Sequence, residues 1–184
     1  NHRKVCIIDM REAWLGSFNI SATHSRRLSG DAVWRDTGVR VIGAGTRDLR
    51  RAFERVWYTP AERRGWSRAR RLAASRIRAS ELVKLNWKSR QRRRNFRTLV
   101  QRMKNARQKI WITNPYFVPH GALLRALTGA ARRGVDVRLI VPRRSDIFFM
   151  PWVGAYFYEP LLRGGVRIFE YRRGILHAKS VLID

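Results

Sequence analysis

Two short segments of this sequence repeat one arrangement of histidine, lysine and aspartate. The first has His2 and Lys4 one residue apart and Asp9 after four more residues, and the second places His177, Lys179 and Asp184 at the same spacing. An imidazole can act as a nucleophile or a proton donor, and an ammonium neutralises phosphate oxygens. Two such motifs predict in-line displacement at a phosphodiester, with a nucleophile and a general acid on opposite sides of one phosphorus.

Both motifs run into β-branched, apolar segments, at residues 5–8 and 180–183. Side chains two residues apart on a strand point to the same face, so each histidine shares a face with its lysine. The alternative, two histidines buried in a core, does not account for the duplicated motif. The pattern further predicts strands at 17–20, 39–42, 109–113, 135–141, 166–171 and 175–183, and helices beginning near 46, 96 and 121. This alternation indicates an α/β fold.

The first motif continues in a way that identifies a family. After Asp9 come six residues and then Gly16-Ser17-Phe18-Asn19. The spacing H-x-K-x4-D-x6-G-S-x-N resembles that of the phospholipase D superfamily, which carries the motif twice. The second copy ends at Asp184, so its G-S-x-N lies outside the sequence. Four further stretches resemble bacterial cardiolipin synthases: residues 34–41, 114–119, 133–137 and 176–179.

The resemblance implies a role for each motif residue. His2 would be the nucleophile that forms a phosphohistidine and His177 the general acid, although the motifs are pseudo-symmetric and the roles could be reversed. The phosphate oxygens would be bound by Lys4, Lys179, Ser17 and Asn19. Asp9 and Asp184 would hold the loops after their strands. Asp36 would hydrogen-bond a catalytic histidine, the alternative being a surface aspartate paired with a neighbouring arginine.

The family implies a phosphatidyltransferase that joins two phosphatidylglycerols and releases glycerol, without a metal or other cofactor. The expected partner is an anionic, phosphatidylglycerol-like phospholipid, and the expected location is a membrane surface, the bacterial inner membrane. Three alternatives are a hydrolytic phospholipase D, a nuclease or phosphodiesterase acting on nucleic acid, and a non-catalytic binding module. Two motifs in one chain favour the lipid enzyme, because related nucleases often carry one motif per chain. The sequence does not predict an oligomeric state.

The implied fold is a phospholipase D-like, pseudo-twofold, two-lobe α/β fold with mixed sheets flanked by helices. Residues 1–95 would be the C-terminal part of the first lobe with an Arg-rich connection, and residues 96–184 the N-terminal part of the second. Because the sequence begins beside one motif and ends on the other, we expect a piece of a longer protein, inactive in isolation.

Composition adds a formal net charge of +27 over 184 residues, carried by 34 Arg and 6 Lys. This charge suits an anionic partner, but an Arg-rich coding background would also produce it. The Arg-rich middle, from about 61 to 95, is either a solvated face or a lipid contact. The aromatic segment 148–158 is better interpreted as core than as a membrane interface. His24 and His120 match no motif and are expected in surface loops.

Overall fold

The computed structural model describes residues 4–58 and 89–184. Contacts divide these residues into two units. Residues 4–16, 38–58 and 89–95 form one unit, and residues 17–37 and 96–184 form the other. Most of the Arg-rich middle, and His2 of the first motif, lie outside the described residues. Within the described residues, none of the helices is both long enough and apolar enough to span a membrane.

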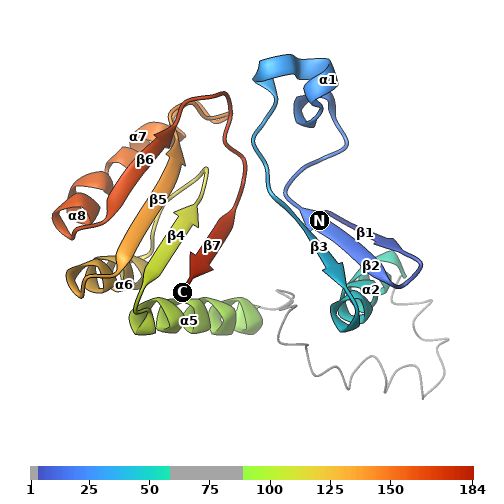
Figure 1. Cartoon of the computed structure of the whole chain (residues 1–184), viewed down its shortest axis with the longest axis horizontal. Helices are drawn as coiled ribbons and strands as arrows, with labels where there is room; N and C mark the ends of the chain where they lie inside the picture. The colour runs from blue at the N-terminus through green and yellow to red at the C-terminus, as the bar shows by residue number, and fades with distance from the viewer. Residues whose placement is uncertain (1–3, 59–88) are drawn as a thin grey trace. The chain divides into compact units, whose positions relative to one another are not determined.

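The first unit contains an antiparallel sheet in the order β1-β2-β3, made of β1 (Lys4–Ile8), β2 (Glu12–Gly16) and β3 (Gly38–Ile42). Figure 1 shows these strands in blue. β1 and β2 are joined by a tight turn in which the amide of Arg11 donates to the carbonyl of Ile8 at 3.0 Å. Asp9 and Met10 have φ of 48° and 57°, the left-handed backbone that a type I′ hairpin turn requires.

Helix α2 (Ala44–Trp57) covers this sheet. It begins after Gly43, whose φ of 85° suits glycine, and not at Thr46 as the capping pattern predicts. Thr46 is fully buried instead, and its hydroxyl donates to the carbonyl of Arg11 at 3.4 Å. The buried face consists of Leu49 and Ala52, together with Ala13 of β2.

The second unit contains a mixed sheet in the order β6-β5-β4-β7. Its strands are β4 (Lys109–Thr113), β5 (Asp136–Pro142), β6 (Arg167–Tyr171) and β7 (Ser180–Ile183). β5 pairs in parallel with both β4 and β6, while β7 pairs antiparallel with β4. β7 is therefore the strand that directly follows the second histidine-lysine pair, and it lies at one edge of the sheet.

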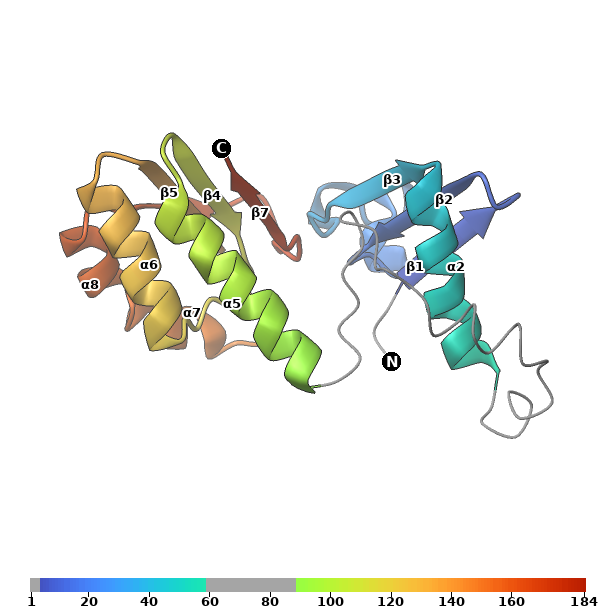
Figure 2. The ribbon, with the colours of Figure 1, turned by 90° about the horizontal axis from the view of Figure 1, so that it is seen from below.

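Four helices accompany this sheet: α5 (Ser89–Asn105), α6 (Gly121–Arg132), α7 (Met150–Ala155) and α8 (Tyr158–Arg163). The core between helices and sheet is apolar, and its fully buried members include Met103 of α5, Leu127 of α6 and Leu161 of α8. On β5 the buried residues alternate as the sequence predicts, at Val137, Leu139 and Val141. Figure 2 shows α5 and α6 beside this sheet. Sheets flanked by helices confirm the predicted α/β class.

Several expected elements differ from the structure, and the helix expected to begin near 96 begins at Ser89. Residues 17–20 do not form a strand, because the strand comes earlier, at β2. The last strand begins at Ser180, and residues 175–179 instead form an extended segment that carries the second motif. The aromatic segment is core only at its C-terminal end, where Phe157 and Tyr158 pack against the core. Phe148 is 76%, Trp152 70% and Tyr156 80% exposed, so the interpretation as core is wrong for these three residues.

Candidate active site

Backbone pairing in the second unit brings two distant segments together. Arg35 forms an isolated parallel bridge with Leu176. The amide of Arg35 donates to the carbonyl of Ile175 at 2.8 Å, and the carbonyl of Arg35 accepts from the amides of His177 and Ala178, both at 2.9 Å. Neighbours of a paired residue come into contact across the pair, so this short bridge places Asp36 beside the second motif.

The carboxylate of Asp36 is buried, with the side chain 7% exposed. Its Oδ2 lies 3.0 Å from Nδ1 of His177 in hydrogen-bond geometry, and its Oδ1 accepts a hydrogen bond from the hydroxyl of Ser17. A carboxylate bonded to one imidazole nitrogen fixes the tautomer and leaves the other nitrogen, Nε2, for proton transfer. Two predicted site residues, Ser17 and His177, therefore meet at a third, Asp36.

Lys179 follows on the same segment. Its ammonium donates to the carbonyl of His177 at 2.9 Å and lies 5.4 Å from the centre of the Tyr116 ring. The hydroxyl of Tyr116 in turn donates to the carboxylate of Asp146 at 2.8 Å. Burial of the phenol, with a smaller contribution from the bond to Asp146, raises the pKa of Tyr116 to about 12. Tyr116 therefore stays neutral at neutral pH and presents its ring to the motif lysine.

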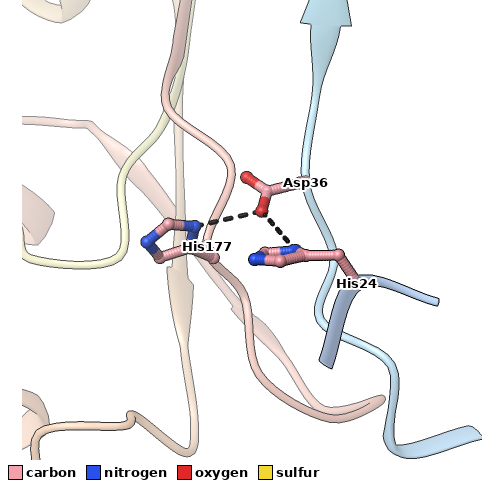
Figure 3. A group of neighbouring side chains, drawn as sticks. All are labelled: His24, Asp36 and His177. Atoms are coloured by element: carbon pink, nitrogen blue, oxygen red, sulfur yellow. Dashed lines mark hydrogen bonds and ion pairs between the residues drawn. The ribbon is translucent and has the colours of Figure 1, made fainter. Parts of the chain in front are cut away.

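His24, which was expected in a surface loop, lies against Asp36 instead. The residue ends a short 3-10 helix (Ala22–His24), yet its side chain is only 7% exposed. Its Nδ1 lies 3.1 Å from Oδ2 of Asp36, on the same oxygen that His177 uses (Figure 3). The only signal in the sequence was a histidine between the first motif and Asp36, and nothing in its spacing indicates that the chain folds it back.

Three donor atoms of this group, from His24, Asp36 and His177, lie within 4.8 Å of one another. That spacing and that set of side chains are compatible with a transition metal ion. However, the carboxylate and His177 are already joined by a hydrogen bond, the arrangement expected of a catalytic pair. The geometry is therefore explained without a metal.

Asp184 is bonded to the backbone before β4. Its carboxylate accepts hydrogen bonds from the amides of Arg107, Gln108 and Lys109 at 2.9–3.0 Å. These bonds, led by that from Lys109, hold the pKa of Asp184 below its usual range. Asp184 also has a left-handed φ of 51°, close to the 48° of Asp9. Each motif aspartate thus follows its strand with a similar, positive φ.

The remaining predicted residues are carried by other segments of the chain. Lys4 begins β1 of the first unit, and Asp9 lies in the turn after that strand. Asn19 is exposed in the segment after β2. His120, the other histidine expected at the surface, is exposed, and its Nδ1 accepts a hydrogen bond from the amide of Ala122 at the start of α6.

Comparison with known proteins shows what the chain is similar to. Residues 99–184 match the family described as "Cardiolipin synthase, PLD-like domain". Over its whole length the chain is 35% identical to cardiolipin synthase B of Escherichia coli K12 and 32% identical to cardiolipin synthase A of Pseudomonas syringae. It is 31% identical to a cardiolipin synthase of Clostridium perfringens. The chain spans 45%, 38% and 40% of the lengths of these three relatives.

The matching region contains α6, the mixed sheet and the second motif, and the similarity to the synthases extends across the first motif and the segment that carries Asp36. The resemblance inferred from the motifs is thereby confirmed. The chain is similar to bacterial cardiolipin synthases along its whole length, and its residues 99–184 match the model of the cardiolipin synthase, PLD-like domain.

Proposed function

We propose that the protein containing this chain is a phosphatidyltransferase of the cardiolipin synthase type. The observation that carries the proposal is the hydrogen bond of 3.0 Å between Asp36 and Nδ1 of His177. It orients an imidazole for proton transfer, one residue away from a lysine that can neutralise a phosphate. Relatives that are named cardiolipin synthases supply the substrate class.

In the proposed reaction, His2 attacks the phosphorus of a phosphatidylglycerol and forms a phosphatidyl-histidine. The bond from phosphorus to the glycerol oxygen breaks, and His177 donates its Nε2 proton to the departing glycerol. A hydroxyl of a second phosphatidylglycerol then attacks the phosphorus while His177 takes its proton. The bond to His2 breaks and cardiolipin leaves. All protons return to their starting places, and no cofactor is consumed.

The other predicted residues keep their proposed roles. Lys4, Lys179, Ser17 and Asn19 bind phosphate oxygens, and Asp9 and Asp184 are architectural. The hydroxyl hydrogen of Ser17 is directed to Asp36, so this serine would also couple the phosphate to the Asp36 carboxylate. We further propose two lobes, residues 1–95 and 96–184, and action at the bacterial inner membrane, where the anionic substrate is found.

The test uses the full-length protein and vesicles that contain labelled phosphatidylglycerol. Wild type is compared with His2→Ala and His177→Ala, and the lipid products are separated. The proposal is supported if wild type produces cardiolipin and glycerol and neither variant does. Phosphatidic acid without cardiolipin would identify a hydrolytic phospholipase D instead. If single-stranded DNA were cleaved and no lipid were changed, the enzyme would belong to the nuclease branch.

A further inference from the structure

The imidazole of His24 is buried. Within the described part of the chain, neither of its ring nitrogens has a hydrogen-bond partner, and both are inaccessible to solvent. Nδ1 is close to the carboxylate of Asp36, at 3.1 Å, but outside hydrogen-bond geometry. Burying such a group is unfavourable, and an apolar side chain of similar size would fill the same space without that cost. A role in the site would account for a histidine here.

The rings of His24, Trp34 and His177 pack against one another, and the two imidazoles contact the carboxylate of Asp36. The ring of His24 meets the ring of Trp34 edge-on, with centroids 5.6 Å apart, and lies 5.9 Å from the ring of His177. Trp34 is itself 5.2 Å from His177. The amide of Trp34 donates to the carbonyl of Thr23 at 2.8 Å, which joins the 3-10 helix that ends at His24 to the segment that carries Asp36.

The oxygens of Asp36 are thereby enclosed. Ser17 bonds to Oδ1, His177 bonds to Oδ2, and His24 covers Oδ2 from another side. Figure 3 shows the two imidazoles approaching this one oxygen from different segments. Without the ring of His24, water could reach Oδ2 and compete with His177 for it. The direction of the His177 ring would then be held less firmly.

We propose that His24 is a positioning residue for the second motif, which keeps the Asp36 carboxylate dry and directed at Nδ1 of His177. In the cycle, His177 loses the Nε2 proton when glycerol leaves, and the negative charge of Asp36 is then less well compensated. A small rotation of His24 brings its Nδ1–H into hydrogen-bond geometry with Oδ2 at that moment. The inference rests on the proposed function for its catalytic role, but the geometry that it asserts can be measured without turnover.

The experiment compares His24→Ala and His24→Asn in the full-length protein, with His120→Ala as the matched control because His120 lies outside this cluster. Asn keeps a donor near the place of Nδ1. We expect kcat for phosphatidyl transfer to fall on the order of 10- to 100-fold in His24→Ala, the size typical of a catalytic group displaced by about 1 Å. KM should stay within about twofold, and His24→Asn should recover part of the loss.

A second measurement separates this inference from the function. Nitrogen-resolved NMR of the histidine rings reports whether Nδ1 of His177 carries the proton bonded to Asp36. We expect that bonded proton in wild type and in His24→Asn, and its exchange with water in His24→Ala. If His24→Ala kept both the proton signal and kcat, the inference would be wrong although the enzyme still made cardiolipin. If neither wild type nor any variant acted on lipid, the proposed function would be wrong. The proton signal would still show whether His24 positions His177.

Discussion

Asp36 and His177 are 141 residues apart in the chain and are joined by a hydrogen bond of 3.0 Å. Neither residue lies in a helix or a strand. The backbone of Arg35 pairs with residues 175–178, and this pairing aligns the carboxylate with the imidazole. The acidic partner of the second motif therefore comes from a segment that follows the first motif in the sequence.

The first prediction concerns this carboxylate. Asp36→Asn keeps the size of the side chain but removes the charge that orients His177, and its amide can impose the wrong tautomer. We expect kcat for phosphatidyl transfer to fall about 10³- to 10⁴-fold, as in other carboxylate–imidazole pairs. Initial rates on phosphatidylglycerol vesicles give the answer. The matched control is Asp31→Asn in the same segment, where the side chain is fully exposed and activity should not change. Equal rates for wild type and Asp36→Asn would disprove the role.

The second prediction concerns the stability that Asp184 contributes. Because three backbone amides lower the pKa of Asp184, its ionised form stabilises the fold above the pKa of the unfolded chain, about 3.9. That stability is lost as the pH falls through the lower, folded pKa. Asp184→Asn should therefore lower Tm at pH 7, and the difference from wild type should narrow below about pH 4.

Thermal denaturation followed by circular dichroism at several pH values tests this expectation. Glu159→Gln serves as the control, since Glu159 is largely exposed and pairs only with Arg163 one helical turn away among the described contacts. A Tm difference for Asp184→Asn that stayed constant from pH 7 to pH 3 would contradict the explanation.

The third prediction concerns the core of the second unit. Leu127 on α6 is fully buried among the helices and the mixed sheet, so Leu127→Ala leaves a cavity. We expect the free energy of unfolding to fall by about 2–5 kcal/mol. Leu162→Ala on α8, where the side chain is 55% exposed, should change it by less than about 0.5 kcal/mol. Urea denaturation measures the free energy of unfolding of both variants. Equal decreases in the two variants would contradict the placement of Leu127 in the core.

The fourth prediction concerns Tyr116, whose pKa is raised to about 12 mainly by burial and then by Asp146. Asp146→Asn removes the negative charge, so the phenol should ionise at lower pH than in wild type but still above the ordinary value of 10. Ultraviolet titration of phenolate absorbance, with Tyr116→Phe to identify the relevant step, measures the shift. An upward shift in Asp146→Asn would refute the assigned cause.

Much of the second unit was predictable from the sequence. Strand Lys109–Thr113 was predicted at its observed bounds, and the alternation from Val137 to Val141 follows from a strand with one face on a core. The motifs themselves were visible because their spacing is repeated. Such patterns are local, so the sequence of a segment is enough to predict the secondary structure of that segment.

The missed features depend on contacts between distant segments. The sequence suggested that Asp36 would bond a catalytic histidine, but the choice of His177 depends on the pairing of Arg35 with Leu176. His24 has no periodic signal, because its burial comes from a turn that folds onto Trp34. The exposure of Trp152 was missed for a different reason. Aromatic residues occur both in cores and on interaction surfaces, so the residue type alone does not determine whether the side chain is buried.

The central claim, transfer through a phosphohistidine, is tested most directly by trapping the intermediate. The full-length protein is mixed briefly with phosphatidylglycerol labelled in the phosphatidyl group, denatured without acid, digested, and its labelled peptide sequenced by mass spectrometry. We predict label on His2 in wild type and none in His2→Ala. Cardiolipin formation from a protein that never carries label would contradict the account, and label on His177 instead would reverse the two histidine roles.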